Sequence, residues 1–399
     1  MGETRFVVAG SLIDGSGGGP RRKVFLAMRG GMITAIGPAA ELPRSDAGDV
    51  DDYSHCTILP ALVDCSVCLS RSPSVDWQVR LAAEEAGPEG KTAMLAQHIR
   101  YCHIHGVLGV ADGDDPDGLV QGVRKREEGE GRIRIRTSGR LCRSRLDCRE
   151  DSPGGKDFLK VDYSGNIEDE EPPHQRLGPE DLHDMLRLRG ERKAVVVANG
   201  PEQVAEALDA GCDAIEQGYA MGEDNLRRMA DMGVLWIPSV LRARNALLGA
   251  GSGGSVCCRF SLRYVAPGTP VPGAEAHWKK VLADQLAQLR LARQLGVGTA
   301  VGTGAGGVGL LHGESMAEEM KLFLKAGYSL AETIHCASER GARFFGLEEL
   351  GALAAGRPAT FLITRGGTEQ LPRKLSYLEG IYVGGAPSSL YRKNPVKMT

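Results

Sequence analysis

Two closely spaced cysteines follow an apolar run in the stretch ILPALVDCSVCLS, residues 58–70. Cys65 and Cys68 form a C-x-x-C there, and Cys257 and Cys258 lie together in a glycine-rich stretch further along. Thiolates bind zinc, iron and iron–sulfur clusters strongly, so these four residues form a candidate zinc or iron site. No second C-x-x-C accompanies the first, and strand alternation directs Cys65 away from Ser66, toward surrounding helices. Scattered free thiols of a reducing compartment are the competing interpretation.

Lys160, in the strand-like stretch DFLKVDYSG, is a second candidate for a reactive residue. The amine of Lys160, if partly desolvated on a barrel strand, would have a lowered pKa and could act as a nucleophile. Schiff-base chemistry is then conceivable, with Tyr163 nearby in sequence. The plainer interpretation is that Lys160 pairs with a local carboxylate such as Asp162 or Glu216.

The histidines do not form an obvious cluster. His98, His103 and His105 lie in AQHIRYCHIHGV, a predicted helix, where we expect polar side chains on the helix surface. His312 follows the last predicted strand in LLHGESMAEEM and is a candidate contact for a ligand, with a role in loop structure as the alternative. We expect His335, in a late helix, to serve in packing.

The elements that must position these residues alternate regularly through the middle of the chain. Short apolar runs bounded by turn residues predict eight strands, separated by amphipathic helices such as PEQVAEALDAG and NLRRMADMG, each of which ends on glycine. The strands are TILPALVD, GVLGVADG, RIRIRTSG, DFLKVDYSG, AVVVANG, DAIEQG, GVLWIPSV and GTAVGTGAG. This pattern predicts an α/β fold with a (β/α)8 barrel, in which function lies at the carboxyl ends of the strands. The flexible stretch LGAGSGGSVCCRFSL, residues 248–262, would lie on that face and could act as a lid.

The sequence at both ends of the chain instead predicts antiparallel strands. RFVVAGSLIDG and KVFLAMRGGMITAIGP alternate apolar residues around an RGG hairpin turn, and ATFLITRG and LEGIYVGG repeat the pattern near the end. We therefore expect a small composite β-sandwich domain from residues 1–56 and 354–399, and the barrel over residues 57–353.

Composition and charge exclude several classes of protein. The 399 residues are 42% hydrophobic and 25% charged, which is ordinary globular composition, and the net charge of −3 argues against nucleic acid as a partner. The stretch MGETRFVVAG lacks the apolar core of a signal peptide, and no later run is long enough to span a bilayer. A cytoplasmic protein without a membrane partner is expected.

Several of these stretches, taken in order, resemble the amidohydrolase superfamily, and within it the imidazolonepropionase and metal-dependent prolidase-like branch. They are AGSLIDGSGGG, GGMITAIGP, LPALVD, FLKVDYSG, AGCDAIEQGY, GVGTAVGTGAG, HGESMAEEM and GALAAGRPATFLI. The resemblance covers nearly the whole chain, including the sheet domain. It implies a metal-dependent hydrolase acting on C–N bonds other than peptide bonds, in which one or two divalent ions polarise the carbonyl and generate hydroxide.

The resemblance also implies where the metal ligands should be. Family members use an H-x-H at the first strand, a carboxylated lysine at the fourth, one histidine each at the fifth and sixth, and at the eighth an aspartate that is also the general base. At these positions the chain carries Ser66 and Cys68, Lys160, Val197, Gln217 and Gly304, respectively. Of the expected groups only the lysine is retained.

These replacements remove the chemistry that the resemblance implies. Valine and glycine side chains cannot bind a metal, neutral oxygens do not replace imidazoles for zinc, and no base remains at the aspartate position. We therefore predict a family member without the usual metal centre and without a cofactor. It would be a pseudo-hydrolase that binds a small molecule in the barrel mouth, or a structural subunit of a homo-oligomer or of a complex with an active paralogue. The alternatives are an active hydrolase with a remodelled site that uses Cys68, Lys160 and His312, and the cysteine-ligated metal protein above.

Overall fold

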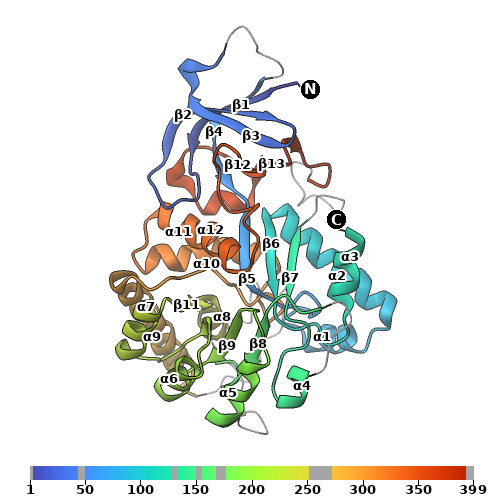
Figure 1. Cartoon of the computed structure of the whole chain (residues 1–399), viewed down its shortest axis with the longest axis vertical. Helices are drawn as coiled ribbons and strands as arrows, with labels where there is room; N and C mark the ends of the chain where they lie inside the picture. Colours follow the sequence, from blue (N-terminus) through green and yellow to red (C-terminus); the bar gives the residue numbers. More distant parts are fainter. Residues whose placement is uncertain are drawn as a thin grey trace.

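The computed structural model describes residues 3–43, 50–127, 133–149, 155–167, 177–250 and 272–391. Strands from both ends of the chain form one sheet, which lies at one end of a barrel made from the middle of the chain (Figure 1). The predicted fold class, a (β/α)8 barrel with a composite terminal sheet domain, is confirmed.

The terminal domain is a seven-stranded sheet with the order β14-β13-β12-β4-β1-β2-β3. Its strands are β1 (Arg5–Leu12), β2 (Arg21–Arg29), β3 (Met32–Pro38), β4 (Val50–Pro60), β12 (Phe361–Arg365), β13 (Leu378–Val383) and β14 (Ala386–Pro387). The predicted RGG turn joins β2 to β3, and its two glycines have φ of 58° and 80°, the left-handed values that such a hairpin turn requires.

Strand β4 connects the two parts of the molecule. It pairs with β12 as far as Pro60 and is followed at once by the first barrel strand, so sheet pairing continues past the expected domain limit at residue 56. The limits 1–56, 57–353 and 354–399 stay a prediction.

The barrel contains parallel strands in two runs, β5-β6-β7 and β8-β9-β10-β11. They are β5 (Leu62–Val67), β6 (Val107–Asp112), β7 (Arg134–Thr137), β8 (Leu159–Asp162), β9 (Ala194–Ala198), β10 (Ala214–Gln217) and β11 (Leu235–Ile237). Six of them, β6 to β11, fall within stretches predicted from the sequence. The first prediction, residues 57–64, is placed too early: its residues 57–60 belong to β4, and β5 continues to Val67.

The eighth predicted strand, residues 298–306, closes the ring as extended backbone rather than as a regular strand. On one side the Trp236 N–H donates to the Gly298 carbonyl (2.8 Å), and on the other the Cys65 N–H donates to the Val301 carbonyl (3.0 Å). Glycine at position 302 permits this close approach, because a Cβ there would lie 2.4 Å from a methyl carbon of Ile237. The two runs of strands are also linked between β7 and β8. There the N–H of Cys142, which follows β7, donates to the carbonyl of Lys160 in β8 (3.0 Å).

Helices cover the outside of the barrel (Figure 1). They are α1 (Trp77–Glu84), α2 (Pro88–Ile104), α3 (Leu119–Glu127), α4 (Arg145–Arg149), α5 (Pro179–Arg187), α6 (Pro201–Asp209), α7 (Glu223–Met232), α8 (Val240–Ala250), α9 (Ala274–Leu295), α10 (Glu314–Lys325), α11 (Leu330–Cys336) and α12 (Glu339–Phe344), with short 3₁₀ turns at Ala39–Glu41, Thr368–Gln370 and Arg373–Ser376. The predicted amphipathic helices correspond to α6 and α7, and Gly233 ends α7 in the left-handed conformation. In the part of the chain that the structure describes, no helix is long and apolar enough to cross a membrane.

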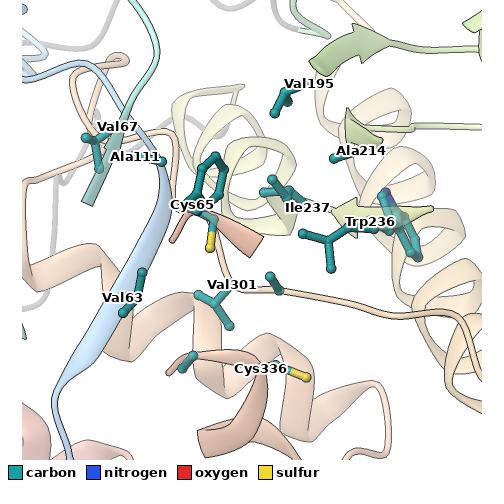
Figure 2. Close-up of a cluster of buried hydrophobic side chains, with 14 of the residues drawn as sticks. Val63, Cys65, Val67, Ala111, Val195, Ala214, Trp236, Ile237, Val301 and Cys336 are labelled. Carbon is teal, nitrogen blue, oxygen red and sulfur yellow. The ribbon is translucent and has the colours of Figure 1, made fainter. Parts of the chain in front are cut away.

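The main core lies between the barrel strands and these helices. Figure 2 shows Cys65 in this core with Val63, Val301 and Cys336. Position 341 on α12 must be glycine for this packing, since a Cβ there would lie 2.3 Å from the Cys65 sulfur. Cys65 therefore faces the helix layer, as strand alternation indicates.

The expectation that His98 and His103 lie on a helix surface is wrong. They are 5% and 1% exposed, on the face of α2 that also buries Leu95, Ile99 and Cys102. Burial is tolerated because each imidazole has a polar partner: the His98 Nδ1 lies 2.8 Å from the Leu69 carbonyl oxygen, and the His103 Nε2 lies 2.8 Å from the Ser388 hydroxyl.

Candidate functional site in the barrel mouth

A cavity of about 240 Å³ opens where the barrel strands end. Its lining includes most of the positions that the sequence singled out, namely Ser66, Cys68, Lys160, Val197 and Gly304. Parallel strands bring them together because their carboxyl ends meet at one face of the barrel. The charged lining residues are Arg71, Arg80, Glu84, Asp114, Arg143, Lys160, Asp162, Glu216 and Arg242.

Glu216, at the end of β10, is the centre of the polar contacts in the cavity. The Lys160 ammonium lies 2.7 Å from one carboxylate oxygen of Glu216, and the Ser66 hydroxyl donates to the other oxygen at 2.8 Å. Both charged side chains are buried, at 9% and 2% exposure. Of the two carboxylate partners considered for Lys160, the structure selects Glu216, whereas Asp162 pairs with Arg143 at 3.3 Å.

Gly113 forms the cavity wall beside the Lys160 side chain. A Cβ at position 113 would lie 2.5 Å from the Lys160 nitrogen, so Gly113 leaves the space that the lysine side chain occupies. The ammonium is thus held between a bare backbone wall and the Glu216 carboxylate.

An arginine that the sequence reasoning did not single out lies beside Gly304, the position at which the resemblance implies an aspartate. A Cβ built on Gly304 would lie 2.6–2.8 Å from three atoms of the Arg242 guanidinium. Arg242 comes from the first turn of α8, just after β11. The only sequence signal for it was a basic side chain near the end of a barrel strand.

The amide at the sixth-strand ligand position is fully occupied by protein partners. The Gln217 side-chain oxygen accepts from the Ile167 N–H (3.0 Å) and the Asn199 amide (3.1 Å), and its nitrogen donates to the Asn166 side-chain oxygen (2.8 Å). Gln217 is buried and is not among the lining residues. Its role in this structure is to tie together the loops after β8, β9 and β10.

The two cysteines of the C-x-x-C lie in different surroundings. The Cys68 thiol donates to the Asp114 carbonyl at 3.4 Å, and burial raises its pKa to about 12, against an opposing effect of Arg71. Cys65 packs against α12, and burial also raises its pKa well above the ordinary thiol value. Both are therefore protonated at neutral pH. The other two members of the candidate thiolate site, Cys257 and Cys258, lie outside the described residues, as do residues 251–262 of the predicted lid.

His312 lies behind the cavity wall rather than in it. Its Nε2 is 3.0 Å from the Cys68 carbonyl oxygen, and its ring stacks on His98 with centroids 4.0 Å apart. Burial, with a smaller contribution from His98, lowers the pKa of His312 well below the usual value, so the ring is neutral. His312 supports the backbone that presents Cys68.

A buried carboxyl next to the site holds the barrel closed. Asp64 accepts from the Thr303 N–H (2.9 Å), the Thr303 hydroxyl (2.6 Å) and the Ser66 N–H (3.2 Å). Burial raises its pKa to about 6 despite these bonds. Asp64 thus joins β5 to the segment that ends at Gly304.

The residues present do not fit the metal centre that the resemblance implies. The Lys160 nitrogen and the Ser66 hydroxyl both donate to Glu216, and Val197 offers no ligand atom. A guanidinium lies against Gly304, the position at which the resemblance implies an aspartate. Among the described residues, no group of three or more histidine, cysteine, aspartate or glutamate side chains is arranged to hold a metal.

Solved structures share this architecture over nearly their full length. A Xaa-Pro dipeptidase with bound methionine in its active site is 18% identical, with a TM-score of 0.80 over 96% of this chain and 99% of that one. An ochratoxinase from A. niger is 17% identical, with a TM-score of 0.75 over 97% of this chain and 95% of that one. A putative prolidase from Bifidobacterium longum is 18% identical, with a TM-score of 0.75 over 96% and 94%. At these identities the similarity establishes the fold alone.

The sequence comparisons are more selective. Among curated proteins, none matches this sequence. The profile of the amidohydrolase family matches residues 144–390, more than half of the chain, from α4 through the last barrel segments into the terminal sheet. On this evidence, the chain belongs to the amidohydrolase family.

Proposed function

We propose that this protein is an amidohydrolase-family member that has lost the metal centre and binds a small molecule in the barrel mouth without hydrolysing it. The observation that carries the proposal is the buried ion pair between Lys160 and Glu216. The Lys160 nitrogen is held at 2.7 Å by a protein carboxylate, in an ion pair inside the mouth. The retained lysine therefore serves the fold of the mouth.

The position at which the resemblance implies the general base supports the same proposal. Position 304 has no side chain, and the carboxylate of Glu216 is held by Lys160 and Ser66. A general base must reach the water or substrate whose proton it removes and must be able to accept that proton. Both carboxylate oxygens of Glu216 already have protein partners, one in Ser66 and the other in Lys160.

Bound metal per chain is the first test. Protein purified anaerobically, without chelator or nickel affinity resin, should contain near-zero zinc, iron, manganese and nickel by elemental analysis. It should also give no turnover with a panel of acyl-amino acids and cyclic imides. One or more equivalents of metal that disappear in a Cys68→Ser variant would overturn the proposal and support the cysteine-ligated site.

A remodelled hydrolase that uses Cys68 and Lys160 makes the opposite prediction. Its turnover would be abolished by Cys68→Ala or Lys160→Ala. The raised pKa of the Cys68 thiol opposes it, because the thiolate rather than the thiol is the nucleophile. Measurable turnover that is lost in both variants would replace the proposal above.

A subunit role is the second part of the proposal and is supported by apolar side chains near the mouth. Trp77 and Leu81 on α1 are 62% and 41% exposed, one helical turn apart, and Val308 beside the cavity is 52% exposed. Such a surface suits a contact with another copy or with an active paralogue. Light scattering that shows a monomer, together with no capture of a paralogue, would remove this version. The cytoplasmic location expected from the sequence also stays a proposal.

A further inference from the structure

The place of Arg242 in the cavity suggests what the mouth can bind. Its guanidinium lies against the Gly304 backbone, and one of its terminal nitrogens lies 3.6 Å from where a Cβ on Gly307 would be. The adjoining cavity wall, Gly304–Gly307, is glycine apart from Ala305. Arg242 is one of the residues that line the cavity, so its guanidinium borders the space that a ligand would occupy.

The lining is rich in cations that are close to one another. Three of them form ion pairs with lining carboxylates: Lys160 with Glu216, Arg71 with Asp114 and Arg143 with Asp162. Two more arginines, Arg80 and Arg242, and one more carboxylate, Glu84, also line the cavity. Arg71 and Arg242 line the same cavity, so an anion bound in it would be attracted by both positive charges.

We infer that the barrel mouth binds a small organic anion through an oxyanion group, a carboxylate or a phosphate, with the Arg242 guanidinium as its principal contact. The inference rests on the proposed function and names the class of its ligand. A guanidinium presents a planar set of N–H donors that matches the oxygens of a carboxylate or phosphate.

The same geometry accounts for binding without hydrolysis. In the family, the resemblance places metal ions in this mouth, which attract a substrate oxygen and also generate hydroxide. A guanidinium attracts an anionic oxygen by charge and by hydrogen bonds, but it is always protonated and activates no water. The site would still attract the anionic oxygen of a ligand, but it would not generate the hydroxide that attacks it.

Arginine-selective labelling tests the inference on the unmodified protein. Phenylglyoxal modification of Arg242 is followed by peptide mass spectrometry, in chloride and then in sodium phosphate or sodium acetate at equal ionic strength. We expect phosphate or acetate to slow the labelling of Arg242 severalfold. The labelling of Arg228, a surface arginine paired with Asp209 at 2.6 Å, should stay unchanged. The anion that protects more strongly distinguishes phosphate from carboxylate ligands.

Variants give an independent readout. Arg242→Gln should weaken the binding of the protecting anion, measured by calorimetry, by about tenfold or more, the effect of losing one charge-assisted hydrogen bond. Arg242→Lys should restore part of it, and Arg228→Gln should have no effect. Circular dichroism establishes that each variant is folded. Equal labelling of Arg242 in all three salts, or full binding by a folded Arg242→Gln protein, would overturn the inference.

Failure of this inference and failure of the proposed function are distinguishable on one preparation. Metal-free, inactive protein that no anion protects would refute the anion site and leave the pseudo-hydrolase standing. Stoichiometric metal with turnover would refute both, because the ligand would then be recognised by a metal.

Discussion

At the scale of single residues, Glu216 determines the character of the barrel mouth. It accepts hydrogen bonds from Ser66 and Lys160 at 2.8 and 2.7 Å while almost fully buried. A buried ion pair contributes little over a well-packed apolar pair, but removing one partner leaves an uncompensated charge. Lys160 and Glu216 therefore depend on each other for their burial in the mouth.

Glu216→Gln should destabilise the protein by about 3–5 kcal/mol, because the Lys160 ammonium loses its counter-charge in a buried site. The double variant Lys160→Met, Glu216→Gln should recover most of that loss, since the glutamine oxygen can still accept from Ser66. Urea unfolding of the wild type, the two single variants and the double variant measures the coupling. A loss below about 1 kcal/mol in Glu216→Gln would mean that the carboxylate is not the partner of a buried charge.

At the scale of elements, β5 is held from both sides. Asp64 bonds to Thr303 on the mouth side of the ring, and Cys65 packs against α12 on the other. The close approach of β5 and α12 depends on Gly341, which lies in the interior of the helix. Glycine is a poor helix former, so its presence inside α12 is explained by this packing and not by helix stability.

Gly341→Ala should therefore destabilise the protein by about 1–3 kcal/mol, although the same change in an open helix stabilises it. The physical reason is the 2.3 Å approach of the new Cβ to the Cys65 sulfur. Adding Cys65→Ala should relieve the clash, so that the double variant is more stable than the sum of the single changes predicts. Thermal unfolding of the four proteins is the measurement. A higher melting temperature for Gly341→Ala alone would show that β5 and α12 are not in this contact.

At the scale of the whole molecule, buried carboxyls link stability to pH. Glu319 of α10 accepts from the N–H groups of Val240 and Leu241 at 2.8 and 2.7 Å, and so holds the start of α8, the helix that carries Arg242. Burial raises the pKa of Glu319 to about 8; the two N–H bonds and Arg244 oppose this shift, and Asp64 adds to it. Burial likewise raises the pKa of Asp112 to about 7.

The sign of the effect follows from linkage. Between the unfolded pKa near 4.5 and the folded pKa of about 8, the native state binds more protons than the unfolded state, so stability falls as pH rises. We expect the free energy of unfolding in urea to be higher at pH 5.5 than at pH 8.5. The slope should be smaller in Glu319→Gln, which has no titrating group there. An identical slope in the two proteins would assign the pH dependence to other groups.

The sequence alone determined the elements and their order, because strand and helix periodicities and turn residues are local properties. Right-handed parallel connections then place every strand end at one face, so Ser66, Cys68, Lys160, Val197 and Gly304 could be predicted to meet in one mouth. The residue types at the positions where the resemblance implies metal ligands could also be read from the sequence.

The tertiary structure decided which side chains surround these positions. That Glu216 rather than Asp162 pairs with Lys160 depends on which side chains point inward across neighbouring strands, and that Arg242 fills the space at Gly304 depends on the packing of α8 against a distant loop. The burial of His98 and His103 depended equally on partners from remote segments, Leu69 and Ser388. Contacts between residues far apart in the chain are set by the whole fold, and no local pattern encodes them.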